Sequence, residues 1–316
     1  MDGSTQVHVR NHDLLADALA GLTADEKTLG PKWLYDHRGS ALFEKITRLP
    51  EYYPTRTEAG ILHDNAAALA GLVPSAGALV ELGSGASVKT RTLLDAGGHI
   101  GAYVPIDISR DFLLETAAAL KNAYPALDVV PVVADFTAPV TLPDALAALP
   151  KAAFFPGSTI GNLTPARAQA LLSGVRAWPG IEAFILGADM VKDISQLIAA
   201  YDDAQGVTAE FISNILVRLN RETGADFDLN AFDYKATWNA DLARIDMHLV
   251  SNRSQQVTVG ERTIPFYAGE PIHVSAARKY TTNSLTALAN STGWDLHDCH
   301  TDANGRFSVA VLRPGG

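Results

Sequence analysis

The stretch Val80-Glu81-Leu82-Gly83-Ser84-Gly85-Ala86-Ser87 decides the fold that we predict for this chain of 316 residues. The apolar run at 78–82 is typical of a buried strand, and two glycines follow at the point where the strand ends. Helical patterns separate it from further apolar runs of this kind at 102–107, 128–134, 152–155 and 183–187. Strands and helices that alternate at this spacing predict a doubly wound α/β fold with a parallel sheet.

After residue 193 the sequence no longer shows this alternation of predicted strands and helices. Residues 194–220 predict two helices, and several strand-like runs follow before residue 270. We therefore expect two domains. One would be a Rossmann-like domain of residues 60–193 and 281–316, and the other an α+β domain of residues 1–59 and 194–280.

Local capping signals predict a helix that starts just before residue 60. A helix should run from about Thr55 to about Leu72. Thr55 would be its N-cap, and Glu58 stands three residues later, at the position that completes a capping box.

Composition and charge argue against several functional classes. The chain is 47% apolar and 19% charged, as in an ordinary globular protein. Its net charge is −10 and it has no run of five basic residues, so we expect no nucleic-acid partner. No stretch reaches the ~18 apolar residues of a membrane helix. The single cysteine, Cys299, fits a reducing cytoplasmic setting. Nothing in the sequence demands a dimer, so we expect a monomer.

The histidines do not predict a metal site. None of the nine has the spacing of an HExxH motif or of a comparable ligand set. His297 and His300 lie close to Cys299, and we expect a surface loop there rather than a metal site.

Three features in order along the chain predict a nucleotide-like cofactor. The glycines of the first turn allow close approach of a ligand to the backbone. Asp107 ends the second strand, twenty-four residues after Gly83, where its carboxylate can accept hydrogen bonds from two ribose hydroxyls. Asp135 and Phe136 end the third strand, where a carboxylate can accept from an adenine amino group and a ring can cover the base. Together these features favour S-adenosylmethionine (SAM).

Other interpretations of these residues remain open at this point. A nicotinamide-dependent oxidoreductase is the main alternative, but its GxGxxG fingerprint fails here because Val88 occupies the sixth position. The P-loop motif is absent as well. Asp107 and Asp135 taken singly could be solvated strand-end residues, and a non-catalytic SAM-binding module would keep the same turn.

Longer blocks of the sequence resemble the histidine-specific SAM-dependent methyltransferase family, whose best-known activity is trimethylation of the α-amine of L-histidine on the route to ergothioneine. The similarity covers nearly the whole chain. It is carried by Pro31-Lys32-Trp33-Leu34-Tyr35-Asp36, by residues 39–47, 49–58, 81–85, 156–165 and 186–193, and by shorter matches at 200–203 and 220–222.

The resemblance implies an amino-acid N-methyltransferase in which the Rossmann-like domain binds SAM and the second domain closes over a small amino-acid substrate. The residues that it places at the cofactor are Tyr35, Gly83, Ser84, Gly85, Lys89, Asp107, Asp135 and Phe136. The residues that it places at the substrate are Tyr52, Asn162, Tyr201, Met247, Ser275 and Ala277. Tyr35, Asn162 and Tyr201 would carry catalysis by positioning the amine and the α-carboxylate.

The substrate pocket departs from the family pattern at two positions. In the histidine enzymes, a Glu and a Ser in the segment after the last inserted strand hydrogen-bond the imidazole. The corresponding residues here are Ser275 and Ala277. Loss of the charged acceptor should cost about 1.5–3 kcal/mol, or roughly ten- to hundredfold in binding. Two interpretations follow: histidine is still bound through Ser275, Tyr52 or water, or the substrate is another amino acid, such as an aromatic one. We expect that histidine is not the best substrate.

Overall fold

The computed structural model describes residues 11–316, which form two compact units. Unit 1 contains the described residues up to Tyr53 together with Lys192–Ala277. Unit 2 contains Pro54–Val191 and Arg278–Gly316. These boundaries fall within six residues of those expected from the sequence. The largest difference arises because the helix that begins at Pro54 packs on the sheet of unit 2.

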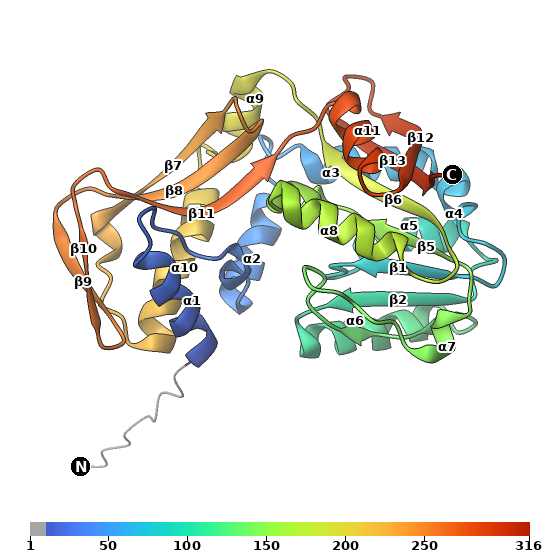
Figure 1. The fold of residues 1–316 in the computed structure, drawn as a ribbon, viewed down its shortest axis with the longest axis horizontal. Coiled ribbons are helices and arrows are strands. Elements are labelled where there is room, and N and C mark those ends of the chain that lie inside the picture. The colour runs from blue at the N-terminus through green and yellow to red at the C-terminus, as the bar shows by residue number, and fades with distance from the viewer. Residues whose placement is uncertain (1–10) are drawn as a thin grey trace, which may run out of the picture. The chain divides into compact units, whose positions relative to one another are not determined.

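Unit 2 is built around an eight-stranded sheet (Figure 1). Its strands are β1 (Ala78–Leu82), β2 (Ala102–Asp107), β3 (Asp128–Val129), β4 (Val132–Val133), β5 (Lys151–Phe155), β6 (Ile181–Asp189), β12 (Trp294–Thr301) and β13 (Phe307–Pro314). They lie in the order β12-β13-β6-β5-β1-β2-β3, with β4 also paired to β2. Strands β1 to β6 pair in parallel, whereas β13 runs antiparallel to both β6 and β12.

The order of the strands reverses on either side of β1. The chain proceeds from β1 outward through β2 and β3, and then returns to form β5 and β6 on the other side. In a doubly wound sheet, ligands bind outside the carboxyl ends of the strands at this switch point. The glycine turn after β1 and the turn after β5 both lie there.

Helices cover both faces of this sheet. One face is covered by α3 (Pro54–Asp64), α4 (Ala66–Ala70), α5 (Val88–Ala96) and α6 (Arg110–Ala123). The other is covered by α7 (Asp144–Ala147), α8 (Pro165–Arg176) and α11 (Thr282–Asn290), with the short helix η2 (Thr159–Asn162) following β5. Because both faces are covered, every residue of β1 and β5 is buried, as the apolar runs in the sequence predicted.

The helix expected from about Thr55 begins at Pro54, within one residue of the prediction, but it ends at Asp64, and α4 occupies most of the remaining expected span. Two other local predictions for unit 2 are wrong. Glu58 does not close a capping box, because its carboxylate accepts hydrogen bonds from Gly157 and Lys89 instead. His297 and His300 lie on strand β12 rather than in a loop. This strand is at the edge of the sheet and largely polar, so the sequence showed no apolar run there.

Unit 1 is an α+β structure. Its helices are α1 (His12–Leu22), η1 (Pro31–Leu34), α2 (His37–Ile46), α9 (Ile194–Ala199), α10 (Val207–Thr223) and η3 (Leu229–Ala231). Strands β7 (Phe232–Asn239), β8 (Arg244–Ser251) and β11 (Pro271–Arg278) form a sheet in the order β11-β8-β7, and β9 (Gln255–Val259) pairs with β10 (Arg262–Phe266). Apolar side chains of α1, α2 and α10 form one core with these strands. The predicted fold class, a Rossmann-like α/β domain with an α+β partner, is confirmed.

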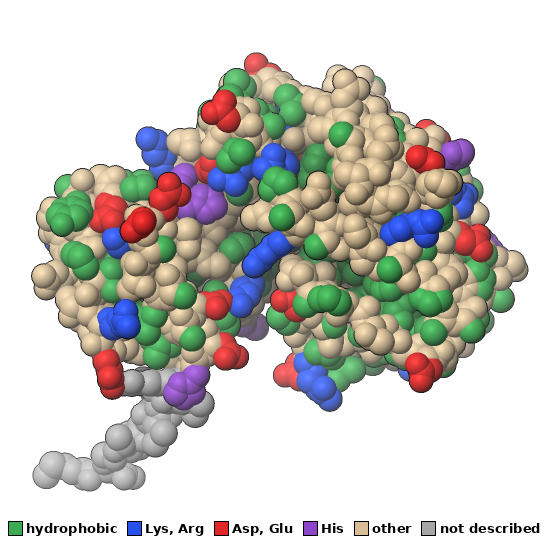
Figure 2. Space-filling model, in the orientation of Figure 1, with side chains coloured by type: hydrophobic (Ala, Val, Ile, Leu, Met, Phe, Trp, Pro, Cys, Tyr) green, Lys and Arg blue, Asp and Glu red, His purple; other side chains and the backbone are tan. Residues whose placement is uncertain are grey.

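The surface agrees with the acidic composition. On the face drawn in Figure 2, basic side chains of the described residues occur in small groups among acidic and neutral ones. Within residues 11–316, no helix is both long enough and apolar enough to cross a bilayer.

Candidate active site

The glycine turn after β1 has the backbone shape that its sequence suggested. Gly83 and Gly85 have φ of +66° and +49°, in the left-handed region that favours glycine. A Cβ on Gly83 would lie 3.0 Å from the ring of Phe136, so this glycine lets the turn touch the end of the third strand. A Cβ on Gly85 would meet no atom within 4 Å, which leaves space in front of the turn for a ligand.

Asp107 is held against the same turn. One carboxylate oxygen, Oδ2, accepts a hydrogen bond of 3.0 Å from the backbone N–H of Gly85. The other, Oδ1, accepts one of 2.9 Å from Ser109. Each oxygen has a second lone pair, so the carboxylate can also accept from hydroxyl groups of a ligand.

Asp135 and Phe136 follow β4 at the same edge of the sheet. The Asp135 side chain is exposed, and its Oδ1 accepts from the backbone N–H and the hydroxyl of Thr137 at 2.8 and 2.6 Å. The ring of Phe136 is half-buried and packs edge-to-face on Phe155, with centroids 5.3 Å apart. A flat apolar surface and a carboxylate acceptor are therefore side by side, as recognition of an adenine base requires.

Two further polar groups complete this part of unit 2. The hydroxyl of Ser84 is buried and has no hydrogen-bond partner among the described residues, as fits a group that donates to a ligand. Lys89 lies in the first turn of α5, and its ammonium donates to Glu58. The structure thus brings together the seven unit 2 residues predicted at the cofactor, and their geometry fits a nucleoside with a charged tail. The sequence indicated Glu58 only as a helix-capping residue.

A buried polar network lies beneath the turn. Glu81 is 2% exposed and accepts hydrogen bonds from the hydroxyls of Tyr103 and of Thr90, the latter at 2.5 Å. Tyr103 also bonds the hydroxyl of Ser87, a residue held at a φ of +50° at the end of the turn. Burial raises the pKa of Glu81 to about 7, although these two hydrogen bonds and the charge of Lys89 oppose the shift.

This pKa gives a prediction for the variant Glu81→Gln. The folded protein binds the Glu81 proton more tightly than the unfolded chain, whose pKa is about 4.5. The resulting stabilisation is complete below pH 4.5 and is lost as the pH rises towards 7. We expect the free energy of unfolding of the wild type, relative to E81Q, to fall by about 3 kcal/mol over that window. Denaturant unfolding of both proteins at pH 4.5 and pH 8 measures this change in stability. A difference between the two proteins that does not change with pH would contradict the prediction.

Tyr35, predicted at the cofactor and in catalysis, and the predicted substrate residues Tyr52 and Tyr201 belong to unit 1, where aromatic contacts connect them. Tyr35 packs edge-to-face on Phe43 and Phe211, at centroid distances of 5.8 and 5.4 Å. Phe43 also contacts Tyr52, which in turn packs on Tyr201 at 5.9 Å. Such pairs contribute about 0.5–1.5 kcal/mol each beyond their buried area, so the cluster fixes the three tyrosines relative to one another.

The remaining side-chain pocket residues lie on neighbouring strands of the unit 1 sheet. Met247 is on β8 and is 5% exposed. Ser275 and Ala277 are on β11 and are 7% and 4% exposed. Burial at these two positions means that a larger acidic side chain would have to be accommodated inside the protein. The small residues found here leave no carboxylate on that part of β11.

Asn162 is the predicted substrate residue that belongs to unit 2. It ends η2 and its side chain is exposed. The preceding residue, Gly161, is tightly packed, since a Cβ on it would lie 2.6 Å from the carbonyl oxygen of Arg278. The backbone before Asn162 is therefore fixed, whereas its side chain is accessible to a ligand.

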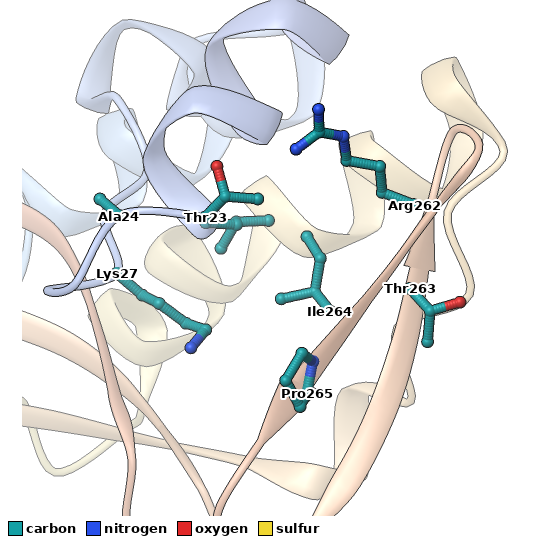
Figure 3. Close-up of a pocket in the computed structure, with 8 residues that line it drawn as sticks. Thr23, Ala24, Lys27, Arg262, Thr263, Ile264 and Pro265 are labelled. Carbon is teal, nitrogen blue, oxygen red and sulfur yellow. The ribbon is translucent and has the colours of Figure 1, made fainter.

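One pocket of unit 1 lies apart from all these residues (Figure 3). It has a volume of about 380 Å³ and is lined by the end of α1 and by β10, including Thr23, Lys27 and Arg262. In Figure 3 the Lys27 side chain lies to the left of Ile264 and above Pro265, and its ammonium forms an ion pair with Glu270. None of the predicted site residues lines it, so we assign no role to this pocket.

Comparison with known proteins identifies the enzyme class. A model of the histidine-specific, SAM-dependent methyltransferases matches residues 14–314. The chain belongs to this family. It is 42% identical over 311 residues to the histidine N-alpha-methyltransferase of Mycolicibacterium smegmatis and 43% identical over 310 residues to that of Mycobacterium tuberculosis. Both alignments cover 94% of this chain and 94% of the relative.

Membership of the histidine-specific methyltransferase family confirms two of the sequence predictions. The chain is a methyltransferase, and its cofactor is SAM. More distant relatives widen the range of named substrates. The 4-dimethylallyltryptophan N-methyltransferase of Trichophyton verrucosum is 26% identical over 311 residues, covering 89% of each chain.

Proposed function

We propose that this methyltransferase acts on the α-amine of an L-amino acid and prefers an aromatic side chain to the imidazole of histidine. The preference rests on one observation, which is that Ser275 and Ala277 occupy buried positions of β11 where the resemblance implies a carboxylate and a hydroxyl. Without the carboxylate, an imidazole N–H loses a charge-assisted hydrogen bond, whereas a hydrocarbon ring loses nothing.

The cofactor roles follow from the arrangement in unit 2. Asp107 would accept from the ribose hydroxyls, and Asp135 with Phe136 would bind the adenine. Lys89 would donate to the carboxylate of the methionine part while it remains bonded to Glu58. Ile108, which the sequence analysis passed over, is an apolar side chain 60% exposed directly after Asp107, and it would cover a face of the base. The position of Ile108, an apolar residue directly after an acidic strand end, could have indicated this role from the sequence.

The substrate roles require a neutral amine whose lone pair faces the methyl carbon of the sulfonium. In the transfer, an N–C bond forms while the S–C bond breaks, and the amine then releases a proton to water. Positioning supplies most of the rate in such an in-line displacement. We assign orientation of the amine to Tyr35, and binding of the α-carboxylate to Asn162 and Tyr201. Tyr52 and Met247 would line the side-chain pocket.

Relatives support both candidate substrates. The two relatives at 42–43% identity are named for histidine, which makes histidine the second candidate. The more distant relative named for 4-dimethylallyltryptophan indicates that the family fold accommodates an indole. The residues at 275 and 277 support the proposal of an aromatic side chain.

Substrate competition tests the proposal. With SAM and an equimolar mixture of the twenty amino acids, mass spectrometry of products should show an aromatic amino acid methylated in preference to histidine. The variant Ser275→Glu/Ala277→Ser should gain roughly ten- to hundredfold in kcat/KM for histidine, since it restores a charge-assisted bond of about 1.5–3 kcal/mol.

The matched control is Ser275→Gln/Ala277→Ser, which has the same size without the charge and should gain far less. A wild-type preference for histidine would reject the aromatic substrate and leave histidine as the substrate. Failure to methylate any amino acid would reject amino-acid methylation altogether.

A further inference from the structure

Glu58 is an acidic side chain in the interior of unit 2 that the methyl transfer as proposed does not use. It lies in the second turn of α3 and is 0% exposed. Its Oε1 and Oε2 accept from the backbone N–H of Gly157 at 2.8 and 2.9 Å. Oε2 also accepts from the ammonium of Lys89. Burial of a carboxyl group is costly unless it is bonded in this way, so these contacts define one position for the side chain.

The carboxyl group is closely packed against β6. A Cβ on Gly187 of β6 would lie 2.1 Å from Oε1, so this glycine provides the space that the carboxylate fills. Gly157 has a φ of +80° and the next residue, Ser158, has a φ of +55°. A turn with two consecutive left-handed residues, one of them not glycine, needs an outside contact to hold it, and Glu58 supplies one.

The two groups that Glu58 binds belong to opposite sides of the switch point of the sheet. Lys89 is in the first turn of α5, the helix that follows β1 and its glycine turn. Gly157 begins the turn after β5, which continues through η2 to Asn162. A single carboxylate therefore links the helix start on the cofactor side to the turn that ends at the proposed substrate residue.

We infer that Glu58 is a positioning residue of the SAM site, whose carboxylate holds Lys89 and the Gly157 turn in the geometry that binds the cofactor. This inference rests on the proposed function, because it takes Lys89 to be a cofactor ligand. An ammonium has three N–H donors, so Lys89 donates to Glu58 and keeps donors for the ligand carboxylate. The Glu58 contact also restricts the rotamers of a long side chain, which lowers the entropy lost when the ligand binds.

A double-mutant cycle tests the inference. Binding of S-adenosylhomocysteine, the reaction product, is measured by calorimetry for the wild type, Glu58→Gln, Lys89→Met and the double variant. Glutamine still accepts from Gly157 but has no charge for Lys89. Each single variant should raise Kd about tenfold, since a charge-assisted bond is lost or misdirected. The double variant should bind within about threefold of K89M, because Glu58 acts through Lys89.

A structural role alone would give a different result, with independent losses that multiply in the double variant. Multiplying losses, or an E58Q affinity within twofold of wild type, would overturn the inference. If E58Q does not fold, Gly187→Ala replaces it in the cycle, because its Cβ displaces the same carboxylate. The control is Glu115→Gln, an exposed carboxylate on α6 of the same unit, which should leave Kd unchanged.

Asp107→Asn distinguishes failure of the inference from failure of the proposed function. If D107N weakens binding while the Glu58 cycle shows no coupling, the result supports the proposed cofactor site and rejects the positioning role of Glu58. If D107N also leaves the affinity at the wild-type value, the proposed cofactor site is wrong and the inference falls with it.

Discussion

Replacing Lys279 by methionine should lower the free energy of unfolding of unit 2 by about 3–5 kcal/mol, because it removes one partner of a buried ion pair. The Lys279 ammonium lies 2.6 Å from Asp189 Oδ2, and the two side chains are 1% and 0% exposed. Water cannot reach Asp189 to replace the lost ammonium.

This pair also ties several backbone segments together. The N–H of Asp189 donates to the hydroxyl of Ser158 at 2.9 Å, and its carbonyl accepts from Tyr280 at 2.8 Å. Val191 donates back to the carbonyl of Tyr280 at 2.8 Å. The ion pair therefore lies where the two segments that lead out of unit 2 are paired, next to the turn that carries Ser158.

Denaturant unfolding followed by circular dichroism measures the effect. The double variant Asp189→Asn/Lys279→Met should regain most of the loss, since no buried charge remains without its counter-ion. Lys121→Met removes an exposed ammonium from α6 of the same unit and should change stability by less than about 0.5 kcal/mol. Equal stabilities for K279M and K121M would show that the pair contributes nothing.

Replacing Gly83 by valine should raise Kd for S-adenosylhomocysteine by about a hundredfold. A β-branched residue at a φ of +66° costs about 1–2 kcal/mol. Its Cβ would also lie 3.0 Å from the ring of Phe136, and displacing that ring moves the proposed adenine surface. The backbone cost lowers the stability of the variant, whereas displacement of the ring weakens binding. A loss of about 3 kcal/mol in binding corresponds to the stated change in Kd.

Gly305→Val is the matched control for this substitution. Gly305 has a φ of +61° in the turn between β12 and β13, and a Cβ there meets no atom within 4 Å. The variant G305V should lower the free energy of unfolding through the same backbone cost, and its Kd should stay at the wild-type value. Calorimetric titration of both variants distinguishes them, and wild-type affinity in G83V would mean that this turn does not hold the cofactor.

Much of the proposed cofactor site could be predicted because its signals are local in the sequence. The apolar run of residues 78–82, the glycines after it and the acidic residues at the ends of later strands each lie within one element and its following turn. Parallel strands place their carboxyl ends at one edge of the sheet, so local positions translate directly into a shared site. The contacts of Gly85 with Asp107 and of Gly83 with Phe136 follow from that rule.

The proposed substrate residues rest on resemblance, because their own local patterns are uninformative. Tyr52 follows a turn and Tyr201 follows a short helix, where a tyrosine has many ordinary uses. Their mutual contact at 5.9 Å joins residues far apart in the sequence, and Phe43 and Phe211 extend the same cluster. Short-range periodicity contains no information about such pairs.

The sequence by itself determined the α/β alternation, the glycine turn after β1 and the strand-end carboxylates, because the hydrophobic pattern and the glycine positions set these locally. Only the tertiary structure decided what Glu58 does. The sequence suggested a helix cap, yet the carboxylate bonds a backbone N–H 99 residues away and a lysine 31 residues away. A buried acidic side chain takes whichever donors the folded chain brings within reach, and the packing of α3, α5, β5 and β6 selects them.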